Sequence, residues 1–275
     1  MFNWGGAYTL FRKELWRFLK VSIQTILTPV VTVLLYLLVF SSVMTDRLEI
    51  YEGINYVKFL IPGLVVMAML QNAFANSSSS LFQSKMNRNI VFMLLAPLSN
   101  LEIYTSYVMA CVVRGLLVGA GVWITAFFFE TIWIHNITLV LVFGFLGCGI
   151  LGALGLLGAV CSEKWDHIAA FQNFVILPLS FLSGVFFSIH TLPPFWEKVS
   201  YYNPFFYMVD GFRHGFLGVS DTDPLLSLTV TAVFFILVSI AGLLILRSRH
   251  RLILRMCIFN AININYKEGP HAGIG

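Results

Sequence analysis

The sequence contains few charged residues. Asp, Glu, Lys and Arg make up 11% of its 275 residues, whereas soluble domains carry about 25%. Hydrophobic residues make up 58%, and a water-soluble fold of this size could not hide so much apolar surface. A bilayer accepts that surface, because its interior is itself an apolar solvent. The composition therefore excludes a soluble domain and indicates a single membrane domain.

Motifs that carry enzyme chemistry are missing as well. The chain contains no GxSxG nucleophile elbow and no HExxH zinc motif, and its four cysteines form no CxxC pair. We therefore expect no catalytic residue, no metal and no cofactor, and we predict that the chain is not an enzyme. A GxxxxGK[ST] phosphate loop is also missing, so binding of ATP in that mode would require another chain.

Long apolar segments dominate what is present. Each is close to the roughly 20 residues that a helix needs to cross the hydrocarbon core. They predict an all-α membrane protein with six transmembrane helices, at residues 22–44, 58–80, 103–129, 137–160, 168–189 and 224–246. We accordingly divide the chain into an N-terminal segment 1–20, a transmembrane domain 21–250 and a cytoplasmic tail 251–275, which we expect to be of limited order.

Residues 1–20 mix apolar and charged side chains. Leu10 and Phe18 lie among Arg12, Lys13 and Lys20, a pattern typical of an amphipathic helix in the membrane interface. Composition alone fits a simple topology anchor as well as a helix that docks onto a partner.

Lys and Arg are unevenly distributed along the chain. With the N-terminus inside, the inner segments hold twelve of the 17 Lys and Arg residues and the outer segments hold four. Because Lys and Arg accumulate in cytoplasmic loops, we predict a protein of the bacterial inner membrane with both termini in the cytoplasm. The basic clusters flank apolar spans instead of forming a broad face, so we expect membrane lipid and no nucleic acid as a partner.

The outer segment before the last span is long, apolar and broken by prolines. Pro193–Pro194 and Asn203–Pro204 divide it into pieces of roughly 10 to 14 residues, which are too short to span a bilayer. We therefore predict short re-entrant or interfacial helices between residues 190 and 219.

Arg114 is the one strong charge deep in a predicted span. It follows Ile103 by 11 residues, or about 16 Å along a helix, which places it near the middle of the bilayer. Such a charge is costly and usually faces the protein interior. Two interpretations stay open: a structural arginine that pairs with a neighbouring helix, or a residue on a substrate path.

Glycines recur along the third and fourth predicted spans. The third carries Gly115 and Gly119 four residues apart, and the fourth carries six glycines between Gly144 and Gly158. Small residues at this spacing let membrane helices approach closely. The pattern predicts close packing within the subunit, and a seam between two subunits is the alternative.

Four ordered motifs carry a resemblance to a known family. They are PLSFLSGVFFSI at 178–189, LPPFW at 192–196, YNPFF at 202–206 and DGFRH at 210–214. With them the chain resembles the ABC-2 family of transporter permeases, in the branch of the YadH-type and NodJ-type permeases, over residues 8 to 250. The resemblance implies the membrane-spanning permease of an ATP-binding-cassette exporter. Such a permease moves an amphipathic or lipid- or glycan-linked substrate outward, while a separate subunit hydrolyses ATP.

The resemblance also implies partners and contact residues. The permease is expected to form a homodimer in which each copy sits on an ATP-binding subunit. Contacts with that subunit are expected from the N-terminal helix and two inner loops, at Phe11, Arg12, Glu14, Arg17, Asn87, Arg88, Glu163, Lys164 and Asp166. The outer segment would form a lid over the path that includes Pro193, Pro194, Trp196, Asn203, Pro204 and Arg213.

A gradient-driven secondary transporter is the alternative function. Many such transporters show repeated halves and intramembrane carboxylates that couple to ions. No Asp or Glu lies in the middle of a predicted span, and neither half of the chain repeats the other. These two observations favour the ATP-driven permease.

Overall fold

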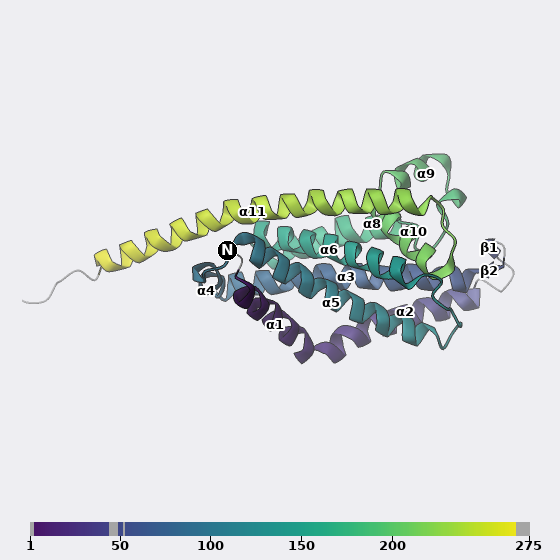
Figure 1. Ribbon diagram of the computed structural model, residues 1–275, viewed down its shortest axis with the longest axis horizontal. Helices are drawn as coiled ribbons and strands as arrows, with labels where there is room; N and C mark the ends of the chain where they lie inside the picture. The colour runs from purple at the N-terminus through teal and green to yellow at the C-terminus, as the bar shows by residue number, and fades with distance from the viewer. Residues whose placement is uncertain (1–2, 44–48, 52, 268–275) are drawn as a thin grey trace, which may run out of the picture.

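The computed structural model describes residues 3–43, 49–51 and 53–267. Long helices lie side by side along one axis (Figure 1). One end holds α1 (Trp4–Lys20) and α4 (Ile90–Leu95), and is called the α1 end below. The opposite end, called the hairpin end, holds the antiparallel strands β1 (Glu49–Tyr51) and β2 (Ile54–Asn55).

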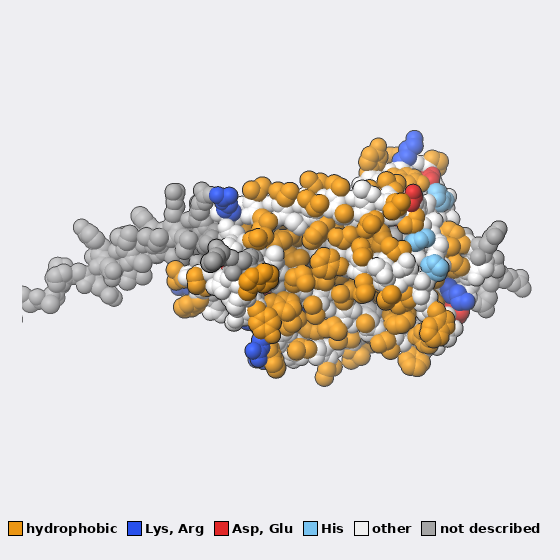
Figure 2. All heavy atoms as spheres, in the orientation of Figure 1, with side chains coloured by type: hydrophobic (Ala, Val, Ile, Leu, Met, Phe, Trp, Pro, Cys, Tyr) orange, Lys and Arg blue, Asp and Glu red, His pale blue; other side chains and the backbone are white. Residues whose placement is uncertain are grey.

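Five helices in the described part of the chain are long and apolar enough to cross a membrane. They are α2 (Ser22–Val43), α3 (Tyr56–Met86), α5 (Asn100–Ala126), α6 (Ile137–Cys161) and α11 (Pro224–Lys267). Hydrophobic side chains cover the body between the two ends, whereas Asp, Glu and His side chains gather at the hairpin end (Figure 2). The helices match the first four predicted spans and the last, and they confirm the all-α membrane class.

The segment predicted to span at 168–189 is shorter and interrupted. α7 (Trp165–Phe171), the π-helical turn η1 (Gln172–Ile176) and α8 (Leu177–Phe181) follow one another as a single helical run. Its length is about 26 Å, somewhat less than the roughly 30 Å of a hydrocarbon core. The run ends before the predicted boundary, where the chain turns at Gly184 with a φ of 75° that glycine adopts without strain.

α3 is the central helix of the bundle. Of its spanning window, 78% is buried, against 17% for α2 and for α11. The glycines of α6 permit close contact with it: a Cβ on Gly155 would lie 2.6 Å from the Phe74 carbonyl oxygen, and one on Gly147 would lie 2.8 Å from Leu70. These glycines pack helices within the subunit, as the sequence pattern predicted.

Polar side chains fix where two of the spans begin. The α5 helix starts with a capping box, in which Ser99 accepts a hydrogen bond from the Glu102 N–H and Glu102 accepts one from the Ser99 N–H. The side chain of Asn136 accepts from the first backbone N–H groups of α6. Such caps satisfy donors that the helix itself leaves unpaired.

The segment between α8 and α11 folds into short helices, as predicted. They are the 3₁₀ turn η2 (Ile189–Thr191), α9 (Pro194–Tyr201) and α10 (Pro204–Leu217). Beyond them, α11 runs without interruption to Lys267. Residues 251–267 are therefore helical where we predicted limited order, because no Gly or Pro occurs after Gly242 in the helix to break it. The last eight residues of the predicted tail, 268–275, lie outside the described part.

Candidate functional site: a polar cavity beside α2

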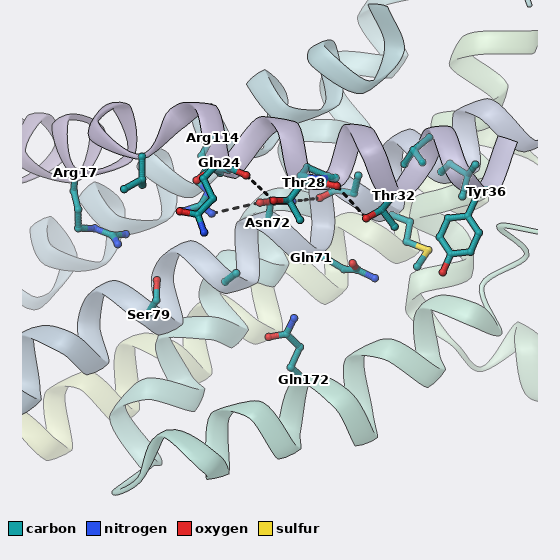
Figure 3. A pocket seen from close by; sticks show the side chains of 18 residues that line it. Arg17, Gln24, Thr28, Thr32, Tyr36, Gln71, Asn72, Ser79, Arg114 and Gln172 are labelled. Carbon is teal, nitrogen blue, oxygen red and sulfur yellow. Dashed lines mark hydrogen bonds between the residues drawn. The ribbon is translucent and has the colours of Figure 1, made fainter. Parts of the chain in front are cut away.

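A cavity of about 500 Å³ lies where α2 faces α3. α2 lines it with a polar side chain at every fourth position, namely Gln24, Thr28, Thr32 and Tyr36 (Figure 3). Side chains four apart share a helix face, so this polar stripe runs for about 18 Å along the helix. The hydroxyls of Thr28 and Thr32 each donate to a carbonyl one turn earlier, which lets them sit in an apolar helix.

The opposite wall of the cavity also carries amides. Gln71 and Asn72 project from α3, and Gln172 projects from the π-helical turn η1 (Figure 3). The Nε2 atom of Gln71 is buried and has no hydrogen-bond partner. A π-turn inside a longer helical run is frequently found at functional sites, and here it places an amide against the cavity.

Two arginines meet at the α1 end of the cavity. Arg17 donates to the side-chain oxygen of Asn76 at 2.7 Å, and Arg114 donates to the same oxygen at 3.1 Å. Arg114 also reaches Asn72 at 3.4 Å and lies 5.6 Å from the centre of the Phe18 ring. Amides and an aromatic face thus hold Arg114, and it has no carboxylate within salt-bridge distance among the described residues. Arg114 thus both pairs with a neighbouring helix and lines the cavity, so the structural and the substrate-path interpretations both stay predictions.

Glu14 pairs with only one of these arginines. Its carboxylate accepts from Arg17 Nε at 3.1 Å and from the Ser80 hydroxyl at 2.5 Å, and the residue is 1% exposed. The buried stripe of α1 that includes Glu14 packs against the bundle, because buried positions recur every three or four residues. Of the two predicted ATPase contacts, the side chain of Glu14 is buried against the bundle, whereas that of Arg17 stays 28% exposed.

The other predicted ATPase contacts gather at the α1 end. Phe11 is half-buried and Arg12 exposed on α1, whereas the remaining five are exposed in the two inner loops, at Asn87, Arg88, Glu163, Lys164 and Asp166. The two inner loops are tied to one another through α3, because Lys85 Nζ donates to the Ser162 carbonyl at 2.6 Å. Phe82 packs on Trp165 with ring centres 5.5 Å apart. These residues therefore share one surface.

The predicted lid residues have different roles. Pro194 is the first residue of α9 and Pro204 the first of α10, positions where a helix does not need the N–H that proline lacks. Pro193 is the N-cap of α9. Asn203 caps α10 and donates to the Leu179 carbonyl at 2.8 Å, which ties α10 to α8. Trp196 is 46% exposed on α9.

Arg213, another of the predicted lid residues, is fully buried. Its guanidinium lies 3.8 Å from the centre of the Phe59 ring and donates to the Gly184 carbonyl at 2.5 Å. Burial lowers the pKa of Arg213, and the charges of Asp210 and Asp221 oppose that shift. Arg213 therefore joins α10 to α3 and to the turn after α8.

Asp210 and Asp221 organise the loop beside Arg213. Asp210 accepts from the Asp221 N–H at 2.8 Å and from the Thr222 hydroxyl at 2.7 Å. Asp221 accepts from the Ser188 hydroxyl at 2.7 Å and from the Tyr51 hydroxyl. Burial raises the pKa of Asp210, whereas its hydrogen bonds and the Arg213 charge act the other way. The sequence motifs include Asp210 but did not indicate this cluster, because its partners lie in other segments of the chain.

Comparison with known proteins decides the family. The family model described as ABC-2 type transporter matches residues 6–217. The chain belongs to this family. It is 37% identical over 233 residues to the inner membrane transport permease YadH of Escherichia coli strain K12, which covers 85% of this chain and 91% of YadH.

More distant relatives carry the name nodulation protein J. The protein from Rhizobium leguminosarum bv. viciae is 22% identical over 249 residues, covering 90% of this chain and 95% of its own length. The one from Neorhizobium galegae is 23% identical over 251 residues, covering 90% and 94%. These matches confirm the predicted branch.

Family membership fixes the coarse function. ABC-2 permeases are membrane subunits of ABC transporters, and ATP is hydrolysed in a separate subunit. The chain is therefore a transport protein and not an enzyme, and it has an ATP-binding partner. This sets aside the gradient-driven secondary transporter.

Proposed function

We propose that this permease is an exporter that moves an amphipathic or lipid- or glycan-linked substrate outward, as a homodimer whose copies each sit on an ATP-binding subunit. The observation that carries the proposal is the Arg17–Asn76–Arg114 network. Arg17 belongs to α1, at the end of the molecule where ATPase contacts are expected, and the network links it to the wall of the cavity. A movement of α1 would therefore reach the cavity directly.

The membrane orientation in this proposal has the α1 end in the cytoplasm. Described basic residues at that end include Lys13, Lys85 and Arg247, and cytoplasmic segments are enriched in Lys and Arg. The hairpin end then faces outward. The cavity, which follows α2 from its start toward that end, would lie on the route between the two sides.

The proposed ATPase surface consists of the exposed residues of the α1 end. Arg12, Asn87 and Lys164 provide hydrogen-bond donors there, and α4 exposes Phe92 and Leu95 to 74% and 66%. Apolar residues ringed by polar ones are typical of protein interaction sites. Lys85 and Phe82 connect the loops of this surface to the central helix α3, and through it to the cavity.

The proposed homodimer uses the least covered helix of the cavity. Only 17% of the spanning window of α2 is buried within the chain. A second copy against α2 would close the open side of the cavity and convert it into a path. Membrane lipid would cover the remaining apolar surface.

Two experiments test the proposal. Purification of the tagged chain in a mild detergent should recover an ATP-binding subunit in equal amounts, and crosslinking of single cysteines on α2 should capture a permease dimer. The reconstituted complex should then move a fluorescent amphiphile across vesicles in an ATP-dependent manner, and a catalytically dead ATPase should abolish that movement. Transport that persists with the dead ATPase would refute the proposal.

A further inference from the structure

The cavity beside α2 is positively charged at one end. Arg17 and Arg114 line it there, and no Asp or Glu is among the described residues that line it. Glu14 lies behind Arg17 with its side chain fully buried, and its carboxylate pairs with Arg17 and, at 3.8 Å, with Lys13, but not with Arg114. Arg114 is left as a charge that only amides and the Phe18 ring accompany.

Two donors on the cavity wall have no hydrogen-bond partner among the described residues. Arg114 is 9% exposed, and its Nε atom is buried with no hydrogen-bond partner. The buried Nε2 of Gln71, also on the cavity wall, has none either. An unpaired buried donor costs free energy, and a cation inside a membrane costs more unless it is paired. An anionic group that entered the cavity would relieve both costs.

The opposite end of the cavity has a different character. Val33 on α2, with Leu64 and Met67 on α3, lines it there. Because α2 and α3 run in opposite directions, late positions on α2 face early positions on α3 at the hairpin end. Thr32 and Tyr36 of the polar stripe also line this end. The cavity therefore combines a cationic pole with a pole where apolar contacts stand beside hydroxyl groups, which matches a molecule that has a charged head and a largely apolar chain.

We propose that the α1 end of this cavity binds the phosphate- or sulfate-type anionic head of an amphiphile, whose chain lies along α2 toward Val33 and Met67. Arg114 forms the charge-assisted hydrogen bonds to the head. Gln71, which lies nearer to Thr32 than to Arg114 (Figure 3), would donate to a group farther along the molecule. This inference rests on the proposed function, because it assigns the chemical class of a substrate to the exporter.

Binding of defined probes tests the inference without ATP and without an ATPase subunit. The full-length permease in phosphatidylcholine nanodiscs would be titrated with fluorescent dodecyl phosphate and with a fluorescent dodecyl maltoside of equal chain length. Dodecyl phosphate should bind saturably, and Arg114→Gln should weaken its binding about ten- to a hundredfold, since a hydrogen bond to a charged group is lost. Arg247→Gln, which removes an exposed arginine of α11 far along the chain from the cavity, should leave binding unchanged.

Additional measurements distinguish an amphiphile from free phosphate as the ligand, and they show whether a variant is misfolded. Inorganic phosphate should compete only at far higher concentrations than unlabelled dodecyl phosphate, because it lacks the chain. Arg114→Lys, which keeps the charge but not the fork of donors, should bind dodecyl phosphate more tightly than Arg114→Gln, with the elution volume of the protein unchanged. Equal affinity for the phosphate and maltoside probes, or equal binding by the wild-type and Arg114→Gln proteins, would overturn the inference. If inorganic phosphate competed as effectively as dodecyl phosphate, the site would bind a free anion, and the assignment of an amphiphile as its ligand would be wrong.

The outcomes for the inference and for the proposed function are distinct. Specific dodecyl phosphate binding without ATP-driven export would uphold the anionic site and refute the exporter. ATP-driven export of another amphiphile by a protein that shows no such binding would do the reverse.

Discussion

Removal of the buried guanidinium of Arg213 should destabilise the hairpin end of the molecule. The side chain is fully buried, packs on Phe59 and donates to the Gly184 carbonyl. The charges of Asp210 and Asp221 favour its positive form. In Arg213→Met, the apolar volume is largely kept, but these two carboxylates lose their nearby cation.

The magnitude follows from these contacts. Loss of a hydrogen bond from a charged group costs about 1.5–3 kcal/mol, and loss of a desolvated cation–π contact costs about 2 kcal/mol. For a chain of this size, 1 kcal/mol shifts the melting temperature by roughly 2–4 °C. We therefore expect Arg213→Met to lower the melting temperature by about 10 °C.

The assay is thermal unfolding of the purified protein in detergent, followed by size-exclusion chromatography with fluorescence detection. Arg213→Lys, which keeps the charge but not the fork of donors, should lose about half as much. Lys198→Met on neighbouring α9, where the side chain is exposed, is the matched control and should leave the melting temperature unchanged. If Arg213→Met has the same melting temperature as Lys198→Met, the guanidinium does not stabilise the contact between α10 and α3.

Three further predictions concern the α1 end and the central packing. Lys85→Met should free the Ser162 carbonyl and raise amide hydrogen exchange in residues 163–167 about tenfold, whereas unchanged exchange would show that Lys85 does not couple the inner loops. Gly155→Leu should prevent α6 from packing on α3 and abolish accumulation of the protein in the membrane. Gly158→Leu is the control and should be tolerated, because a Cβ there would meet only Phe74, at 3.9 Å. Equal immunoblot signals for the two variants would contradict this prediction. Ser99→Ala should remove the α5 cap and cost about 1 kcal/mol, measured as a lower melting temperature, and an unaltered melting temperature would mean that the cap contributes nothing.

Much of the architecture could be read from hydropathy and charge. Apolar length alone located α2, α3, α5, α6 and α11, because a bilayer requires helices of nearly fixed length. Proline positions located the starts of α9 and α10, since proline is best tolerated in a first turn. The interruption at η1 was not predictable, because a π-turn changes the hydrogen-bond register without a reliable sequence signal.

The candidate site could be predicted only in part. Arg114 was found because a lone charge in an apolar span is conspicuous. The polar residues Gln24, Thr28 and Thr32 occur at every fourth position, so their shared helix face could have been predicted. It was overlooked, because a single Gln or Thr in a membrane helix is common. The buried partners of Glu14 and Arg17 on α3 were not predictable, because a charged residue on an amphipathic helix normally faces water and only a partner on another helix reverses that expectation.

The sequence by itself determined that this chain spans a membrane, where its helices lie and to which family it belongs. Those properties depend on local length, composition and ordered motifs. The tertiary structure decided which polar groups meet: Arg17 of α1, Asn76 of α3 and Arg114 of α5 converge on one amide oxygen, and Arg213 is enclosed between α10 and α3. Such convergence depends on the rotation and packing of helices far apart in the chain, which no local pattern specifies.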